Sequence, residues 1–358
     1  MSRKEILSKL SFTVPQGRSI RLIIMTDLAN EADDPYAVMH ILLSPTFDVK
    51  GIVAGHFEYY PKLIDGIMQE RGIPLEKRAE MLGGKMAERG SSMLRSMAVG
   101  KELLSIADMT EVPLLAGSRF ELNAWEELAN LGEQDRFPAD CWQRLQDGRV
   151  IPTSPGADLI IEEALKDDPR PLYVTTLGGV TDLAIAVLKC PEASERMTAV
   201  LNGGAAYPAG GEEFNFHQDI PAVNVLMESK LPLWQIPSVV YSVTDVSFAR
   251  LQREIRPCGP VGAYLYEETI AFHQKTAVQN KDFGSEGWCL GDNSVVYALL
   301  IPESHLKSHM EDAPMLQDDL SYGKRENAKK IRVIDAIDPH YILTDLIEKL
   351  SICYPNQA

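Results

Sequence analysis

The feature that most constrains this chain is an apolar run that ends in a cluster of acidic residues, RLIIMTDLANEADDPYAV at residues 21–38. Residues 22–25 are apolar on both faces, which predicts a buried parallel strand. Apolar residues at helical spacing begin after Pro35, so the acids lie in a strand-to-helix turn. In a doubly wound sheet, ligands bind at such turns, just beyond the carboxyl ends of the strands.

This turn holds four acids and an asparagine within eight residues: Asp27, Asn30, Glu31, Asp33 and Asp34. The helix dipole favours acids in a first helical turn, and capping alone would explain one or two of them. Several carboxylates packed together repel one another unless protons or a hard cation neutralise them. We therefore favour a metal or substrate site over helix capping at this turn.

Strand-like and helix-like segments alternate along the chain, as in a parallel sheet flanked by helices. The further predicted strands are residues 49–54, 112–115, 171–175, 199–202 and 233–236. The predicted helical segments are residues 103–109, 158–165, 180–188 and 223–229, and residues 331–350 form a strand and then a helix that begins at Asp338 and Pro339. No linker or repeat divides the chain, so we expect one α/β domain over residues 1–358, with an open, mostly parallel sheet. A helical insertion is expected at residues 59–89 and an irregular surface loop carrying Trp142 at residues 132–151.

The composition limits the classes of partner. The chain has 51 acidic and 35 basic residues and a formal net charge of −16, which argues against nucleic acid or an anionic membrane. No apolar run is long enough to span a bilayer, and the first residues are too polar for a secretory signal. The five cysteines are odd in number and lack metal-site spacing, which is typical of reduced thiols. We therefore expect a cytoplasmic protein that acts on a small molecule.

Three later turns carry polar residues that could complete a site. In the segment TTLGGVTD at residues 175–182, the two glycines would let a backbone carbonyl or a ligand approach closely, and Asp182 is expected to cap the following helix. Glu213 and Asn215 are spaced to point the same way on an extended stretch, as partners of sugar hydroxyls would be, although ordinary loop polarity gives the same spacing. Asp292 precedes an apolar helix, and taken alone it is best interpreted as a helix cap.

Taken in order, the four turns resemble motifs of the inosine-uridine-preferring nucleoside hydrolase family, in a divergent branch. The family's opening D-x-D-P-G-x-D-D is similar to TDLANEADD here, and its P-T-G-G-x-T-N is similar to TLGGVTD. Its E-F-N with a later Asp is similar to EFNFHQD, and its H-D-P is similar to GDN. The resemblance runs in order from about residue 20 to residue 350. It implies a nucleoside hydrolase-like open sheet with a Rossmann-like core.

The resemblance also implies a Ca²⁺ ion in the cleft, and this hard cation prefers oxygen ligands. The implied metal ligands are the carboxylates of Asp27, Asp34 and Asp292 and the backbone carbonyl of Leu177. Asp27 would also take the proton of the attacking water. The implied contacts to ribose hydroxyls come from Asp33, Glu213 and Asn215. Asn30 or Glu31 could add a metal ligand or a contact at the rim. Carboxylates such as Asp33 would offset the positive charge that grows on the sugar.

The chain departs from the family pattern at three points. The spacing between the first Asp and the Asp pair is two residues longer, and we prefer an insertion that keeps Asp27, rather than Ala29, as the metal ligand. The family's late His, which is thought to help the leaving base depart, is Gly291 here. The loop before Glu213 is also shortened.

Other side chains could replace the missing acid or contact the base. The candidates for the acid are His56, His217 and His273, although a lone histidine is more often structural. His217 is also a candidate for binding the substrate. Trp288 could stack on a base, and a core or lid position is equally open. His40 is expected to pack among apolar neighbours.

Three functions are consistent with these residues. The first is calcium-dependent hydrolysis of the N-glycosidic bond of purine or pyrimidine ribonucleosides, which gives ribose and a free base. The second is hydrolysis of another ribosyl or furanosyl conjugate, because the late His and the loop before Glu213 are altered. The third is a non-catalytic calcium- and sugar-binding protein. Soluble enzymes of this kind are commonly symmetric, so we expect a homodimer or homotetramer.

Overall fold

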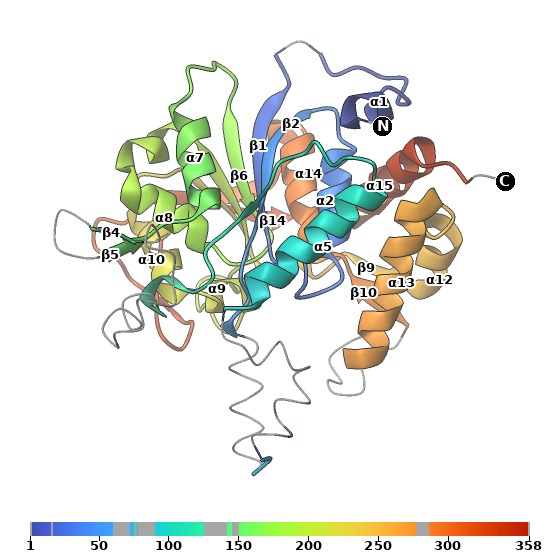
Figure 1. The fold of residues 1–358 in the computed structure, drawn as a ribbon. Helices are drawn as coiled ribbons and strands as arrows, with labels where there is room; N and C mark the ends of the chain where they lie inside the picture. Colours follow the sequence, from blue (N-terminus) through green and yellow to red (C-terminus); the bar gives the residue numbers. More distant parts are fainter. Residues whose placement is uncertain are drawn as a thin grey trace.

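The computed structural model describes residues 2–15, 17–59, 72–74, 77, 90–124, 142–144, 150–276 and 286–356. Its main element is an eight-stranded sheet with the strand order β11-β14-β8-β7-β6-β1-β2-β3 (Figure 1). All neighbouring strands run parallel except β11 and β14, which are antiparallel. The predicted open, mostly parallel sheet is confirmed.

The strands of this sheet agree closely with the predicted ones, except that residues 307–312 were not predicted as a strand. They are β1 (Ile20–Thr26), β2 (Phe47–Ala54), β3 (Leu114–Ala116), β6 (Leu172–Thr176), β7 (Thr198–Asn202), β8 (Leu233–Ile236), β11 (Lys307–Asp312) and β14 (Lys330–Ala336). Three two-stranded pairs lie apart from it: β4 (Trp142–Arg144) with β5 (Val150–Pro152), β9 (Asp245–Ser247) with β10 (Gly287–Cys289), and β12 (Met315–Leu316) with β13 (Tyr322–Gly323). Trp142 therefore begins a short strand, whereas an irregular loop was predicted. The predicted insertion at residues 59–89 lies almost wholly outside the described residues.

Helices cover both faces of the sheet (Figure 1). One face is covered by α7 (Pro155–Leu165), α8 (Thr181–Lys189) and α10 (Ile220–Glu228). The other face is covered by α2 (Asp34–Leu42), α14 (Ser294–Leu300) and α15 (Pro339–Cys353), with α5 (Ser92–Ile106) and α13 (Gly259–Thr276) packed beside them. The shorter helices and turns are α1 (Arg3–Leu7), α9 (Phe214–His217), α11 (Ser238–Tyr241), α12 (Phe248–Arg250), η3 (Pro191–Arg196), η4 (Leu251–Ile255), η5 (Gly291–Asn293) and η6 (Glu303–His305).

The central strand β1 is buried on both sides, as its apolar sequence predicts. Leu22 and Ile24 pack into the core on the α2 side, whereas Ile23 and Met25 pack into the core on the α8 side. Alternate residues of a strand point to opposite faces, so four consecutive apolar residues supply both cores. This burial fixes the register of β1 and therefore the position of the acids that follow it.

Several helices begin where a capping side chain stands next to a proline. Ser154 accepts a hydrogen bond from the backbone of Ala157 at the start of α7, and Asp219 does the same for Ala222 in α10. Asp338 caps α15, as predicted. These side chains satisfy backbone N–H groups that the first helical turn leaves unpaired. They fix where each helix leaves its loop.

No helix in the described part of the chain is long and apolar enough to cross a membrane. The described cysteines, Cys190, Cys258, Cys289 and Cys353, are all free thiols. This state is the one that the cysteine spacing predicts. The first and last helices, α1 and α15, lie close together (Figure 1), and the Lys9 ammonium just after α1 donates to the Cys353 carbonyl at the end of α15 at 2.6 Å.

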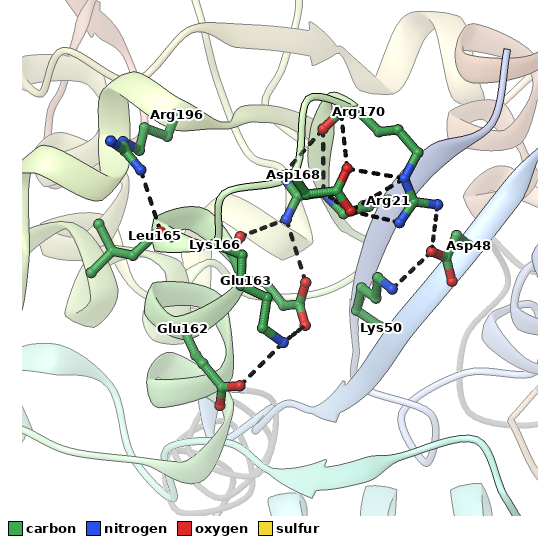
Figure 2. Close-up of polar contacts among 10 residues, drawn as sticks. All are labelled: Arg21, Asp48, Lys50, Glu162, Glu163, Leu165, Lys166, Asp168, Arg170 and Arg196. Carbon is green, nitrogen blue, oxygen red and sulfur yellow. Dashed lines mark hydrogen bonds and ion pairs between the residues drawn. The ribbon is translucent and has the colours of Figure 1, made fainter. Parts of the chain in front are cut away.

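A network of charged residues closes the amino ends of the strands, opposite the ends that carry the acidic turn (Figure 2). At its centre, the Arg21 side chain is 3% exposed and pairs with Glu163 at 3.5 Å and Asp168 at 3.7 Å. The same guanidinium donates to the backbone carbonyls of Glu163 at 2.7 Å and Arg170 at 3.2 Å. Arg21 therefore ties β1 to the end of α7 and to the loop before β6.

Replacing Arg21 with methionine is expected to lower the free energy of unfolding by about 3 kcal/mol, because the backbone carbonyls of Glu163 and Arg170 lose their buried donor and the Glu163 carboxylate keeps only its ion pair to the half-exposed Lys166. Urea denaturation measures this loss. The matched control is Lys230→Met, which removes an ion pair to Glu195 whose side chains are 79% and 55% exposed. The control is expected to be nearly neutral. Equal losses in the two variants would contradict the central role of Arg21.

Candidate functional site

The strand order reverses between β1 and β6, at the middle of the sheet. From β1 the chain builds β2 and β3 in one direction, and from β6 it builds β7 and β8 in the other. Such a reversal leaves a crevice beyond the carboxyl ends of the two strands. A cleft opens at this point. Its lining residues are Asp27, Asn30, Glu31, Asp33, Asp34, Leu177, Asn202, Phe214, Asn215, Tyr241, Gly291 and Asp292.

Three carboxylates meet in this cleft although they are far apart in the sequence. Asp33, Asp34 and Asp292 each present an oxygen atom, and these atoms lie within 4.8 Å of one another. Asp33 Oδ2 accepts a hydrogen bond from the Asp292 backbone at 3.2 Å, and Asp34 accepts one from the Thr26 hydroxyl. Asp292 Oδ1 accepts one from the Asn202 side-chain amide at 2.9 Å. These contacts hold the three carboxylates together.

Helix capping does not account for this cluster. The N-cap of α2 is Asp33, yet its side chain makes no capping hydrogen bond, and Asp34 is the first residue inside the helix. The N-cap of α14 is Asn293, which also makes no such bond, so the interpretation of Asp292 as a cap is wrong. The carboxylates face one another and the cleft, which is the arrangement of a cation site.

Asp27 lies beside this cluster at the end of β1. Its side chain is buried, and its Oδ2 atom has no hydrogen-bond partner among the described residues. A Cβ atom at Gly178 would lie 2.5 Å from Asp27 Oδ1, so only glycine permits this close approach. Gly178 therefore allows the close approach of the Asp27 carboxylate, whereas the predicted partner was a backbone carbonyl or a ligand. Ala29 does not line this cleft and lies instead on a neighbouring cavity.

Burial and mutual repulsion raise the pKa values of the acids in the cleft. Burial raises the pKa of Asp27, Asp34 and Asp292 well above its usual value, and neighbouring carboxylates raise it further. Burial raises the pKa of Asp33 to about 6 and, together with Asp33 and Asp34, that of Glu31 to about 8. Without a cation, the protein must therefore hold protons on several of these groups near neutral pH.

These residues fit a hard divalent cation. The cleft offers carboxylate oxygens, an unpaired buried oxygen on Asp27 and the backbone carbonyl of Leu177, which accepts one hydrogen bond from Asn215 at 2.8 Å and keeps its second lone pair. Oxygen donors of this kind suit Ca²⁺ better than softer metals. Asp33, which was predicted to hold the sugar, belongs to the carboxylate cluster itself.

The segment that carries Glu213 and Asn215 is helical, so the predicted extended stretch is wrong. Glu213 is the N-cap of α9 and does not line the cleft. Asn215 does line it, and its side-chain amide donates to the carbonyls of Leu177 and Asn202, each at 2.8 Å. A carboxylate placed just before a short helix accepts hydrogen bonds from the free N–H groups of that helix. These bonds stabilise a helical turn here, and Glu213 and Asn215 therefore do not point the same way as they would on an extended chain.

Two of the predicted histidines lie beside the cleft without lining it. His56 is buried after β2 and pairs through Nε2 with the Thr181 hydroxyl at 2.8 Å. His217 stacks on Tyr59 with ring centroids 3.6 Å apart and pairs with Glu212 at 2.6 Å. These contacts join His56 to the first residue of α8 and His217 to Tyr59 and Glu212, and neither histidine is among the described residues that line the cleft.

Trp288 lies in the protein interior, and His273 is half-buried beside it. Trp288 is 4% exposed and packs edge-on against Phe272 with ring centroids 5.5 Å apart. Its indole contacts apolar side chains because β10 pairs with β9 and turns alternate residues inward. His273 lies between Phe248 and Trp288. The prediction that Trp288 contacts the substrate is therefore not supported.

Two polar residues have structural roles that differ from the predicted ones. Asp182 does not cap α8 and instead accepts hydrogen bonds from Ser154 and from the backbone of Ser118 at 2.8 Å. His40 is fully buried, as expected, but it is hydrogen-bonded to Asn293 at 3.0 Å and to Asp345 at 2.8 Å. The first network joins two loops near the cleft, and the second supports the residue next to Asp292.

Sequence reasoning missed Asn202 and Tyr241 as residues of the cleft. Asn202 was the end of a predicted strand, and a polar residue at a strand's carboxyl end was a usable signal. Tyr241 ends the short helix α11, and nothing in its local sequence distinguishes it from a surface residue. Both are brought to the site by contacts with segments distant in the sequence.

Comparisons with known proteins agree with this architecture. The family model of the inosine-uridine preferring nucleoside hydrolases matches residues 91–343. An uncharacterized protein of Schizosaccharomyces pombe is 24% identical over 236 residues, which cover 62% of this chain and 72% of that protein. The acidic turn after β1 precedes residues 91–343, so the carboxylates of this turn are evidence that is independent of the family match.

Solved nucleoside hydrolases have the same fold. A plant nucleoside hydrolase superposes with a TM-score of 0.65 at 18% identity, covering 92% of this chain and 98% of that one. A purine-preferring ribonucleoside hydrolase from Gardnerella vaginalis superposes with a TM-score of 0.63 at 17% identity, covering 93% and 99%. The family match covers well over half of the chain, from before β3 into α15. The chain therefore belongs to the inosine-uridine preferring nucleoside hydrolase family.

Proposed function

We propose that this protein hydrolyses the N-glycosidic bond of ribonucleosides, giving ribose and a free base, with Ca²⁺ bound in its cleft. Membership of the family supports a hydrolase of glycosidic bonds. The observation that carries the proposal is the convergence of Asp33, Asp34 and Asp292 within 4.8 Å, at the point where the strand order reverses. An apolar ligand or an anion would not be stable beside these carboxylates, whereas a cation that binds a sugar would be.

The cation would be held by Asp34, Asp292 and the Leu177 carbonyl, with Asp27 and Asp33 at its side. A bound Ca²⁺ supplies positive charge that eases deprotonation of a water and binds a sugar diol. The polar contacts of Asn202 and Thr26 hold the ligand carboxylates in place, and such supporting contacts commonly affect metal affinity. The acids of the cleft need this charge because burial disfavours their ionised forms.

Asp27 is proposed to accept the proton of the attacking water. Its Oδ2 atom is buried and unpaired within the described part of the chain, so it is free to accept a hydrogen bond from a water in the cleft. Cleavage of the bond develops positive charge on the sugar, and the surrounding carboxylates stabilise that charge. Asn215 is fixed by its two donated hydrogen bonds and can position the sugar without reorganising.

A second candidate keeps the same pentose site and changes the group that leaves. It is a glycohydrolase for another ribosyl or furanosyl conjugate, and the observation that favours it is Gly291 at the position of the family's late His. No histidine lines the described part of the cleft. No histidine in the described part of the cleft can therefore protonate a nucleobase as it leaves. A leaving group that departs without a proton would suit this site.

The test is hydrolysis of a panel of purine and pyrimidine nucleosides and of nitrophenyl riboside by the full-length chain, with Ca²⁺ or with EDTA. Faster calcium-dependent release of ribose from a nucleoside supports the first function. Exclusive hydrolysis of nitrophenyl riboside supports the second. If no substrate is hydrolysed, calorimetric titration with ribose and Ca²⁺ decides whether the protein is a non-catalytic binder.

We also propose that the protein is a cytoplasmic homodimer or homotetramer. Its net charge of −16 keeps copies soluble and disfavours anionic membranes and nucleic acid as partners. Sedimentation analysis of the full chain would give the assembly state directly, and a monomer would contradict this part of the proposal.

A further inference from the structure

Helix α2 and the turn η5 bring carboxylates of the cation cluster from distant parts of the chain. Asp34 is the first residue of α2, and Asp292 is the middle residue of η5. Carboxylates packed as closely as these repel one another when they are ionised. Contacts outside the cluster that hold η5 against α2 would therefore favour the binding of a cation between them.

One such contact is the hydrogen bond between His40 and Asn293. His40 lies on the same helix as Asp34, and Asn293 directly follows Asp292. His40 Nδ1 is 3.0 Å from Asn293 Oδ1. Both residues are fully buried, so water does not compete for this bond. It joins the two segments that carry the carboxylates at a point outside the cleft lining.

A closed ring of hydrogen bonds fixes the His40 side chain. His40 Nε2 donates to Asp345 Oδ2 on α15 at 2.8 Å, and the Lys349 ammonium donates to the same oxygen at 2.5 Å. Lys349 also donates to the Ser44 hydroxyl at 2.8 Å, and that hydroxyl donates to the His40 backbone carbonyl at 2.7 Å. Helices α2, α14 and α15 pack against one another here (Figure 1). The ring therefore orients the imidazole with Nδ1 toward Asn293.

Asn293 stands where the family pattern has a proline. The H-D-P of the family is GDN at residues 291–293 here. Proline has no polar side-chain group and could not pair with His40. Asn293 is the N-cap of α14 but makes no capping hydrogen bond, and its amide donates only a long one, 3.5 Å, to the Leu290 carbonyl. Its main polar contact is therefore the one with His40.

We propose that His40 is a positioning residue for the cation site, held in place by Asp345 and Lys349 of the last helix, an inference that rests on the Ca²⁺ site of the proposed function. By fixing η5 against α2, His40 sets the separation of the Asp34 and Asp292 carboxylates before the ion binds. Less free energy is then lost in ordering the site on binding. His40 thereby raises the affinity for Ca²⁺ without contacting the ion.

The test is calorimetric titration of the metal-free full-length chain with Ca²⁺ alone. In His40→Gln, the amide nitrogen reaches the position of Nε2, so the contact with Asp345 can form and the contact with Asn293 is lost. In His40→Asn, the shorter amide reaches the position of Nδ1, so the contact with Asn293 can form. The Kd for Ca²⁺ is expected to rise by about tenfold or more in His40→Gln, as is typical of a lost supporting contact, and to stay within about threefold of the wild-type value in His40→Asn.

Lys329→Met is the matched control for a general loss of stability. Lys329 Nζ donates to the backbone carbonyls of Leu226 and Leu231 at 2.8 and 2.5 Å, and none of these residues lines the cleft. This variant is expected to unfold at a lower temperature in EDTA and to keep the wild-type Kd for Ca²⁺. Thermal unfolding gives a second readout, because a merely structural residue lowers the unfolding temperature equally with Ca²⁺ and with EDTA. His40→Gln is expected to reduce the calcium-dependent rise itself.

Asp345→Ala tests the same inference from a more exposed position, and it replaces the His40 variants if they do not fold. The Asp345 side chain is 22% exposed and does not line the cleft. Its removal frees His40 Nε2 from α15, and the Kd for Ca²⁺ is expected to rise by about tenfold.

The inference is overturned by a wild-type Kd in folded His40→Gln or Asp345→Ala, or by equal losses of affinity in His40→Gln and His40→Asn. A loss in Lys329→Met as large as that in His40→Gln would overturn it as well. Because the readout is Ca²⁺ affinity, a failure to hydrolyse nucleosides contradicts the catalytic proposal alone. A wild-type protein that binds no Ca²⁺ contradicts the proposed cation site and, with it, this inference.

Discussion

Replacing Asp27 with alanine is expected to lower kcat for glycosidic-bond hydrolysis by about a thousandfold or more while the protein remains folded. The Oδ2 atom of Asp27 is buried and unpaired among the described residues, so no hydrogen bond of the fold depends on it. Removing a buried acid next to Asp34 also relieves repulsion, because burial and nearby charges raise the pKa of Asp27 in the metal-free protein. The variant is therefore expected to unfold in EDTA at the same temperature as the wild type or at a higher one.

Initial rates over a range of nucleoside and Ca²⁺ concentrations measure this effect. Asp318→Ala is the matched control, because Asp318 is exposed and is not among the described residues that line the cleft. Wild-type turnover in Asp27→Ala would show that another group accepts the proton. A wild-type protein without turnover, whose ribose and Ca²⁺ affinities are nonetheless measurable, would support the non-catalytic alternative.

The sequence was sufficient to predict how the sheet delivers the acids. A strand that is apolar on both faces must be buried in a sheet that is covered on both sides, and this demand fixes β1 and the turn after it. The same reasoning placed Leu177 at the end of β6, on the strand that pairs with β1. The acids after β1 and the Leu177 carbonyl after β6 converge because the carboxyl ends of these adjacent parallel strands share one edge of the sheet.

Side-chain roles that depend on contacts between distant segments could not be predicted in this way. Asp292 looked like a helix cap from its local sequence, yet its partners are Asp33 and Asn202, which lie 259 and 90 residues away. Trp288 has an aromatic side chain that could stack on a base, but the pairing of β10 with β9 directs this side chain into the core. Local sequence gives the turn, whereas the tertiary fold decides which side chains face the cleft.

Glu213 illustrates how local and distant demands combine. Its position before Phe214 suits a helix cap, and a capping carboxylate is satisfied by the backbone of its own turn. The remaining acceptor position is taken by Tyr241, which is 28 residues away in the sequence. The cap follows from the local sequence, whereas the contact with Tyr241 depends on the tertiary fold.

Ca²⁺ is expected to stabilise the wild-type protein by about 4 kcal/mol at a concentration a thousand times the dissociation constant at pH 8, and the same concentration is expected to give a smaller gain at pH 5.5. Burial raises the pKa of Asp33 to about 6 and that of Asp34 and Asp292 well above its usual value. An acid whose pKa is raised by folding stabilises the folded state below its unfolded value of about 4 and loses that contribution as the pH rises. The metal-free protein therefore becomes less stable from about pH 4 to pH 8.

The cation opposes this loss, because it binds the ionised carboxylates and competes with protons for them. Its effect is expected to be smaller at pH 5.5 than at pH 8, because more protons compete with it for the carboxylates at the lower pH. Thermal unfolding at both pH values, with Ca²⁺ or EDTA, measures the difference. Asp34→Asn is expected to remove most of the calcium-dependent gain and to flatten the pH dependence in EDTA, whereas Asp318→Asn changes neither. A calcium-dependent shift that is equal at the two pH values would mean that Asp33, Asp34 and Asp292 do not share the ion.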